Sequence, residues 1–206
     1  MPARFEIGID EAGRGALIGP MVVAGVKAEN EALSRLRAIG VKDSKKLSPR
    51  KREKLFCEII DVVEYRYRIC PAAEIDTNSL TALELQAISH IIDELLTSPA
   101  AKVIMDCIGK LSERKVRRVV PVLPETQFIY MPKADDHHAV CQAASILAKV
   151  IRDGEVTKIK QRVGIDFGKG YPTQDTLDFI RRYRNEYGVF PPEIRKRWRS
   201  VVQMFS

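Results

Sequence analysis

The chain has 206 residues, 45% of them hydrophobic and 30% charged, which is the composition of a soluble globular protein with enough apolar residues for a core. No apolar run approaches the ~20 residues of a membrane span and no secretory signal opens the chain, so we expect a cytoplasmic protein. The net charge of +7 and two basic clusters, within 42–54 and 181–199, favour nucleic acid as the partner, although either cluster alone is equally compatible with a solvated helix face.

The predicted elements begin with two strands and continue with helices that alternate with further strands. Apolar or alternating runs predict strands at 4–10, 20–27, 64–69, 101–107 and 127–131. Capping residues, prolines and helical periodicity predict helices at 30–39, 49–61, 79–96, 112–120, 136–162, 173–187 and 192–204. This order predicts an α/β fold with helices packed on a sheet. We expect a single domain over 1–206, with 173–206 as a C-terminal helical extension.

Acidic side chains stand where three of the predicted strands end. Asp10 and Glu11 close the first strand, Asp106 ends an otherwise apolar strand, and Asp135 follows the last strand. An adjacent acidic pair at a strand end is by itself most often a solvated turn. Three strand ends that offer carboxylates at one edge of a sheet are instead typical of a site for hard divalent cations such as Mg²⁺ or Mn²⁺. Two such ions about 4 Å apart can promote phosphodiester hydrolysis.

Four stretches between residues 7 and 173 carry a more specific pattern. They are DEAGRG followed by IGP at 10–20, DSKKLS at 43–48, KAD followed by AASILAKV at 133–150, and GKGYPT at 168–173. Together they resemble the motifs of the type 2 ribonucleases H (ribonuclease HII), and the ending with Pro191-Pro192 and Trp198 is similar to archaeal members. The resemblance covers most of the chain and implies a ribonuclease-H-like fold with a mixed five-stranded sheet.

The resemblance also implies roles for particular residues. It implies that the catalytic metal ligands are Asp10, Glu11, Asp106 and Asp135. It implies that the substrate-binding residues are Gly13, Arg14, Gly15, Lys45, Lys46, Ser145, Lys149 and Tyr171. The Gly-Arg-Gly backbone, open to close approach, and the tyrosine would read the 2′-hydroxyl that distinguishes RNA from DNA. The lysines, the serine and the arginine would contact backbone phosphates.

Several of these side chains also have simpler explanations when each is considered alone. Tyr171 could pack on the core, and Lys149 could be a solvated helix residue. Asp136, next to the last carboxylate, is expected to be a helix N-cap. The pair His137 and His138 is expected to be exposed in a first helical turn, although a ligand or proton-transfer role is the alternative.

We therefore expect a metal-dependent endoribonuclease. It is expected to be a monomer and not to associate with a membrane. It would cleave the RNA strand of RNA–DNA hybrids and the 5′ side of single ribonucleotides in duplex DNA, leaving 3′-hydroxyl and 5′-phosphate ends. One alternative is a ribonuclease HIII-type nuclease, which usually has an extra N-terminal domain and lacks this Gly-Arg-Gly. Another is a non-catalytic hybrid-binding module, which would require the loss of a carboxylate, and all four are present.

Overall fold

A computed structural model describes residues 5–41, 47–98 and 101–204 and contains a five-stranded sheet with the order β3-β2-β1-β4-β5. The strands are β1 (Phe5–Ala12), β2 (Met21–Glu29), β3 (Glu64–Cys70), β4 (Ala101–Asp106) and β5 (Gln127–Met131). β2 is antiparallel to both β1 and β3, whereas β4 runs parallel to β1 and β5 runs parallel to β4. The predicted mixed five-stranded sheet is confirmed.

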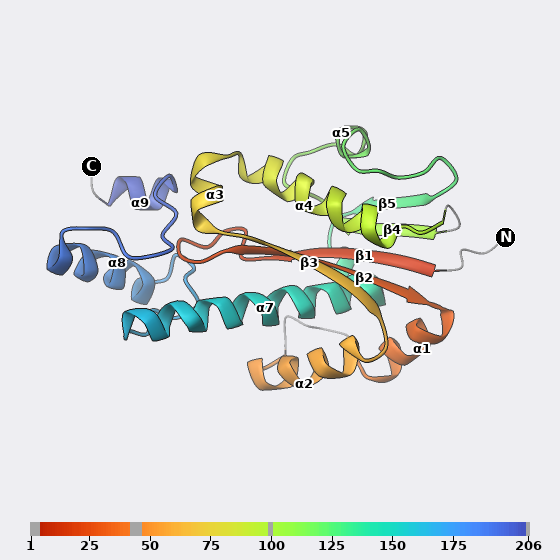
Figure 1. Ribbon diagram of the computed structural model, residues 1–206, viewed down its shortest axis with the longest axis horizontal. Coiled ribbons are helices and arrows are strands. Elements are labelled where there is room, and N and C mark those ends of the chain that lie inside the picture. The colour runs from red at the N-terminus through yellow and green to blue at the C-terminus, as the bar shows by residue number, and fades with distance from the viewer. Residues whose placement is uncertain (1–4, 42–46, 99–100, 205–206) are drawn as a thin grey trace.

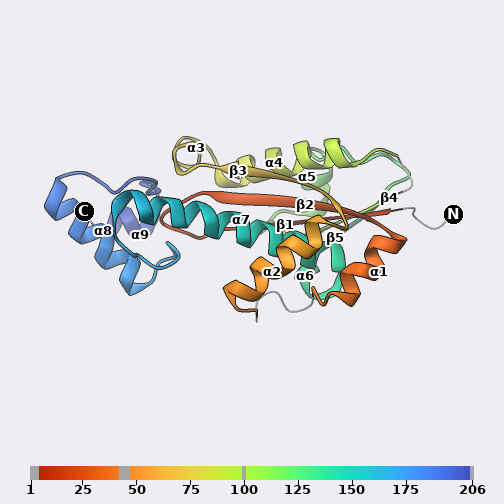
Figure 2. The ribbon, with the colours of Figure 1, turned by 60° about the horizontal axis from the view of Figure 1, so that its bottom comes forward.

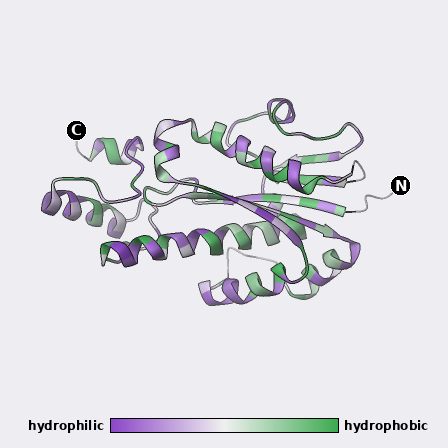
Figure 3. Ribbon diagram, in the orientation of Figure 1, coloured by the Kyte–Doolittle hydropathy of each residue, from purple (hydrophilic) through white to green (hydrophobic). Residues whose placement is uncertain are grey.

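Helices cover both faces of this sheet (Figures 1 and 2). α4 (Leu80–Leu95) lies on one face with α3 and α5, and α7 (Ala139–Val163) lies on the other with α1 and α2. The remaining helices are α1 (Asn30–Ala38), α2 (Pro49–Ile60), α3 (Ala72–Thr77), α5 (Glu113–Arg117), α6 (Ala134–His137), α8 (Gln174–Tyr187) and α9 (Arg199–Gln203). In Figure 3 β3 is mostly hydrophilic, and α8 also carries many hydrophilic residues.

The central strand β1 alternates its side chains between the two helical layers, as the strand period requires. Phe5, Ile7 and Ile9 join the apolar cluster that includes α4. On the other face, a side chain at Gly8 would collide with the backbone of Val140, so glycine lets α7 approach the strand closely. α7 therefore runs directly along β1 toward the carboxyl end of that strand.

The C-terminal segment packs on the same end of the sheet. A third apolar cluster joins Phe167 and Phe179 with Leu17 and Ile18 of the β1–β2 connection and with the second half of α7. The two phenylalanine rings stack with centroids 4.9 Å apart. Figure 1 shows α8 and α9 gathered at the end of the molecule opposite the N-terminus. None of the helices in the described ranges is both long and apolar enough to cross a membrane.

Two predicted helices differ from the structure. The helix expected over 136–162 is divided, because His138 is extended (φ −119°, ψ 122°) between α6 and α7. Asp136 consequently lies inside α6, and the expectation that it caps a helix is wrong; Lys133 occupies the cap position. Helical periodicity cannot reveal a break of a single residue.

Of the segment 192–204, which was expected to be one helix, only α9 is helical. The short α3 was not predicted. Ile194 instead forms an antiparallel bridge with Ile18. The Gly19 amide donates to the Glu193 carbonyl at 2.8 Å, and the Arg195 amide donates to the Leu17 carbonyl at 2.8 Å. Pairing with a distant loop thus overrides the local helical preference of this segment.

Candidate active site

The sheet topology brings the predicted carboxylates to one edge. Ile9 of β1 pairs with Met105 of β4, so Asp10 and Asp106 are the next residues on two adjacent parallel strands. Asp106 in turn pairs with Met131 at the end of β5, and the buried Asp135 follows in α6. The predicted convergence of three strand ends is therefore present in the structure.

Asp10 faces α7, where two side chains hold it. The Ser145 hydroxyl donates a hydrogen bond to the Asp10 carboxylate, and the Lys149 ammonium donates to Ser145 Oγ at 2.6 Å. Burial raises the pKa of Asp10 to about 6, and Asp135 adds to this rise. The hydrogen bond from Ser145 and the charge of Lys149 oppose it. Asp10 therefore lies in a network that favours its ionised form against the cost of burial.

Glu11 lies on the opposite face, toward α4. Burial, together with the charges of Asp10, Glu84 and Asp106, raises the pKa of Glu11 to about 8. Arg14 opposes the rise, but its guanidinium also forms an ion pair with Glu84 at 2.8 Å. The negative charge at this edge thus exceeds what the neighbouring cations neutralise.

Asp106 is fixed by the backbone around it. Its Oδ1 accepts hydrogen bonds from the amide of Cys107 at 2.6 Å and from the amide of Lys133 at 2.8 Å. Lys133 has a left-handed conformation (φ 57°), which turns the chain from β5 into α6. The same turn therefore orients Asp106 and introduces Asp135.

These residues suit a hard divalent cation without forming a closed cage. No group of three or more Asp, Glu, His or Cys side chains within 5–41, 47–98 and 101–204 is already arranged to hold a metal ion. Mg²⁺ usually binds one or two carboxylates and takes its other ligands from water and substrate phosphates, so an open cluster fits. Burial, and to a smaller extent the neighbouring carboxylates, raise the pKa values of Asp10 and Glu11, and a bound cation would favour their ionised forms.

The loop between β1 and β2 adjoins the carboxylates, and glycine is needed at positions 13 and 15 for different reasons. Gly13 has φ +85°, and a Cβ atom there would lie 2.5 Å from Arg152 Nε and 2.6 Å from the Pro20 carbonyl oxygen. No other residue fits at that position without moving a neighbour. Gly15 is exposed, and a Cβ atom there would meet nothing within 4 Å. Its lack of a side chain leaves the backbone open from outside.

Tyr171 is held against this loop. The Gly170 carbonyl accepts hydrogen bonds from the amides of Leu17 at 2.7 Å and Ile18 at 3.1 Å, and the Gly13 amide donates to the Tyr171 hydroxyl at 3.2 Å. The Arg152 guanidinium lies 4.7 Å from the centre of the ring. Tyr171 remains 36% exposed, which excludes simple core packing. It lines a cavity of about 270 Å³ whose other residues are Ala12, Arg52, Lys149, Arg152, Asp153 and Lys169.

Comparison with known proteins places this site in a family. The chain matches the family model described as Ribonuclease HII over residues 7–201. The chain belongs to the ribonuclease HII family. The ribonuclease HII of Pyrococcus furiosus is 39% identical over 204 residues, which cover 94% of this chain and 88% of that protein. The resemblance predicted from the motifs is thereby confirmed, and the protein is an endoribonuclease of the ribonuclease H2 type.

Solved structures agree with the fold of this ribonuclease HII. The crystal structure of the ribonuclease H2 from Pyrococcus horikoshii OT3 has a TM-score of 0.87 and 36% identity, covering 97% of this chain and 96% of that one. The structure of the PCNA:RNase HII complex from Archaeoglobus fulgidus has a TM-score of 0.83 and 32% identity, covering 95% of each chain. The ribonuclease-H-like fold expected from the sequence is confirmed, and membership in the HII family replaces the HIII alternative.

Some predicted substrate-binding side chains of this ribonuclease HII are engaged within the protein. Ser145 is 0% exposed and bonds to Asp10, so it cannot touch a phosphate in this conformation. The Arg14 side chain is directed to Glu84 and also donates to the Thr81 hydroxyl at 3.2 Å. Lys45 and Lys46 lie outside the described residues.

Three site residues were missed by the sequence analysis. Arg152 follows Ser145 and Lys149 at helical spacing, so it lies on the same face of α7 and could have been found from periodicity. Glu84 is an acid within the apolar stripe of α4, which is also a usable signal. Arg195 carries no comparable signal, because it reaches the site only through the unpredicted pairing of the C-terminal segment.

The two histidines beside the last carboxylate are not drawn into the site. His137 is exposed, and burial lowers the pKa of the half-buried His138, whose charged neighbours are Glu6 and Lys102.

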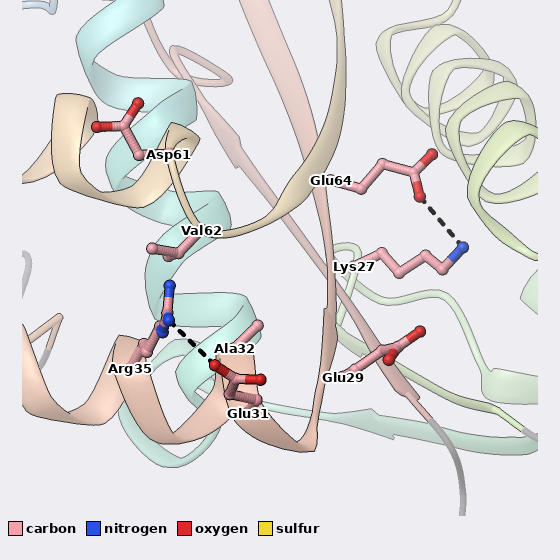
Figure 4. A pocket seen from close by; sticks show the side chains of 8 residues that line it. All are labelled: Lys27, Glu29, Glu31, Ala32, Arg35, Asp61, Val62 and Glu64. Carbon is pink, nitrogen blue, oxygen red and sulfur yellow. Dashed lines mark ion pairs between the residues drawn. The ribbon is translucent and has the colours of Figure 1, made fainter.

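Another pocket with acidic residues lies at the other end of the sheet (Figure 4). Two of its four acids form ion pairs with its two cations: Glu64 with Lys27 at 3.1 Å and Glu31 with Arg35 at 3.0 Å.

Proposed function

We propose that this ribonuclease HII cleaves the RNA strand of RNA–DNA hybrids and the 5′ side of a single ribonucleotide in duplex DNA, with Mg²⁺ or Mn²⁺ as cofactor. The products would carry 3′-hydroxyl and 5′-phosphate ends. One observation carries the proposal: the carboxylates at the ends of β1, β4 and β5 adjoin a glycine loop and an exposed tyrosine. Recognition of a ribose and hydrolysis of its neighbouring phosphate can therefore occur at one place.

The metal ligands would be Asp10, Glu11, Asp106 and Asp135. When bound there, divalent cations would supply an activated water and neutralise charge that develops on the phosphate. Ser145 and Lys149 would keep Asp10 ionised and oriented from the side of α7.

The amides of Cys107 and Lys133 both donate to Oδ1 of Asp106, and neither of these hydrogen bonds uses Oδ2. Glu11, whose protonated form is favoured by its surroundings, would lose its proton on metal binding.

Ribose recognition would use the backbone of Gly13-Arg14-Gly15. The amides of Arg14 and Gly15 donate to no acceptor in the part of the chain that the structure describes. Gly15 leaves open space in front of them. Tyr171 offers an exposed ring on which a sugar can pack and a hydroxyl that lies beside the same backbone. The 2′-hydroxyl is the group for which this arrangement would select.

The supporting surroundings are basic. The cavity beside Tyr171 is lined by four basic residues, Arg52, Lys149, Arg152 and Lys169, and by one acid among the described residues, Asp153. Phosphate contacts from such residues would supply sequence-independent affinity.

We also propose that 1–206 is one ribonuclease-H-like domain, because the apolar cluster of the C-terminal extension includes residues of the β1–β2 loop and α7. A cytoplasmic, monomeric state remains the prediction made from sequence.

The test is a cleavage assay with mapped products. The purified protein is incubated with Mg²⁺ or Mn²⁺ and one of three 5′-labelled duplexes: DNA with one ribonucleotide, a continuous RNA–DNA hybrid, or DNA alone. We expect a single cut 5′ of the lone ribonucleotide, several cuts in the RNA strand, and none in DNA. Cleavage of the all-DNA duplex, or a cut on the 3′ side of the ribonucleotide, would refute the proposal.

A further inference from the structure

Arg195, in the segment between α8 and α9, reaches the loop that the proposed function uses for ribose recognition. Its side chain is 0% exposed, and its guanidinium donates three hydrogen bonds to main-chain oxygens. Nη2 donates to the Gly13 carbonyl at 2.7 Å, Nη1 to the Arg14 carbonyl at 2.9 Å, and Nε to the Gly19 carbonyl at 3.1 Å. One side chain thus binds both ends of the loop.

These bonds set the direction of the amides that face outward. In a trans peptide the C=O and the following N–H point in opposite directions. The Gly13 carbonyl shares its peptide plane with the Arg14 amide, and the Arg14 carbonyl shares its plane with the Gly15 amide. Because Arg195 draws both carbonyls inward, both amides must point away from the core. They are the two amides of this loop that donate to no acceptor among the described residues.

The arginine is itself held by the chain on both sides. Its own amide donates to the Leu17 carbonyl at 2.8 Å, and its guanidinium lies 5.2 Å from the centre of the Trp198 ring. The planar guanidinium offers five donors in a fixed geometry, which a lysine ammonium does not. Burying this cation costs desolvation, and the hydrogen bonds to the three loop carbonyls offset that cost only while the loop keeps this conformation.

We propose that Arg195 is a positioning residue for ribonucleotide recognition. By holding the Gly13 and Arg14 carbonyls, it presents the amides of Arg14 and Gly15 to the sugar and phosphate at the cleavage position. The C-terminal segment is thereby part of the recognition site rather than an accessory to the fold. This inference rests on the proposed function.

The test compares Arg195→Lys with Arg197→Lys. Arg197 is a matched control, because it lies in the same segment and also donates to a carbonyl, that of Asp76 at 3.1 Å, but not to the loop. Both variants are assayed well below their melting temperatures, for kcat/KM on DNA with one ribonucleotide and for metal-free affinity to that duplex and to DNA alone.

We expect Arg195→Lys to lower kcat/KM by roughly 10- to 100-fold, the scale of a misplacement of about 1 Å. It should also remove the preference for the ribonucleotide-containing duplex while affinity for DNA alone stays unchanged. Arg197→Lys should retain both properties. If Arg195→Lys retains the preference for the ribonucleotide-containing duplex as fully as Arg197→Lys does, the inference is overturned. A wild-type protein that does not cut at the ribonucleotide overturns the proposed function instead.

A measurement on the wild-type protein covers the case in which Arg195→Lys does not fold. Amide hydrogen exchange is followed for Arg14 and Gly15 in EDTA, in the free protein and with each duplex. We expect both amides to exchange quickly in the free protein and to slow only with the ribonucleotide-containing duplex. Slow exchange in the free protein, or no slowing with that duplex, contradicts the proposed presentation of these amides.

Discussion

Asp10 and Glu11 are consecutive residues of β1 but face opposite helical layers. Asp10 receives a hydrogen bond from Ser145 of α7, whereas Glu11 lies within the electrostatic influence of Glu84 on α4. The candidate site therefore straddles the edge of the sheet, and each layer adjusts one of its carboxylates. This arrangement follows from the strand period, which sends neighbouring side chains to opposite faces.

Replacing Asp10 or Asp106 with asparagine should abolish cleavage and leave hybrid binding largely intact. The carboxylates serve the chemical step, whereas basic residues hold the nucleic acid backbone. Single-turnover cleavage and metal-free binding to an RNA–DNA hybrid measure the two effects separately. Asp136→Asn is the matched control, since Asp136 is exposed beside Asp135 and is expected to retain activity. Near-wild-type turnover in Asp10→Asn or Asp106→Asn would show that the site is wrongly assigned.

The stability of the metal-free protein should fall as the pH rises from about 4 to about 8. The pKa values of Asp10, about 6, and Glu11, about 8, lie above their ordinary values of 3.8 and 4.5. For an acid with a raised folded-state pKa, the stability contribution is complete below the unfolded-state pKa and is lost as the pH passes the folded-state value.

Glu11→Gln should reduce that decline, and Mg²⁺ should reverse it in the wild type at pH 8. Thermal melts in EDTA across this pH range measure both, with a change in Tm of about 2–4 °C for each kcal/mol. A metal-free wild type that becomes more stable up to pH 8 would contradict the raised pKa values that burial and the neighbouring carboxylates give this cluster.

The Arg14–Glu84 ion pair should contribute to stability in a way that a double-mutant cycle can detect. Glu84 is 1% exposed, so Arg14→Ala leaves a buried carboxylate without its cation. We expect a loss of about 1–3 kcal/mol, below the 3–5 of a fully buried pair because Arg14 is one-third exposed. Adding Glu84→Gln should recover part of this loss in urea unfolding. Strictly additive effects would show that the pair is not coupled.

The sequence identifies the strands and carboxylates because both have local signals. An apolar run that ends in Asp106 predicts a strand and its functional end together, and the parallel order brings Asp10 beside it. Arg195 could not be found in this way, because its role depends on contacts with residues about 180 positions earlier in the chain. The break at His138 was missed for a related reason, since one extended residue leaves the helical period almost unchanged.

Substrate binding should weaken steeply with salt, with a slope of log K against log[salt] of about −0.9 for each phosphate contact. On the basis of the sequence, Lys45→Ala and Lys46→Ala should each reduce that slope and weaken binding to hybrid and DNA duplexes alike. Lys27→Ala is the control, since Lys27 pairs with Glu64 at the far end of the sheet. Fluorescence anisotropy over a salt series provides the measurement. A loss confined to ribonucleotide-containing duplexes would show that these lysines recognise sugar instead.

Tyr171→Phe should lower the efficiency of cleavage at a lone ribonucleotide by several-fold. The Tyr171 hydroxyl accepts a hydrogen bond from the Gly13 amide, so phenylalanine removes that acceptor and the group that can reach a 2′-hydroxyl. A neutral hydrogen bond contributes about 0.5–1.5 kcal/mol, which corresponds to this modest effect. Tyr187→Phe is the matched control, because Tyr187 is exposed on α8 and should tolerate the loss of its hydroxyl.

Tyr171→Ala should reduce cleavage more than Tyr171→Phe, because the ring packed against Arg152 is lost as well. Both losses should be greatest on a duplex with one ribonucleotide, where a single junction is the only place for recognition. A continuous RNA strand offers many registers, so its cleavage should suffer less. Measuring kcat/KM for both variants on both substrates therefore separates recognition from catalysis. Equal losses on the two substrates would assign Tyr171 to supporting the loop through Gly13, with no part in reading the ribose.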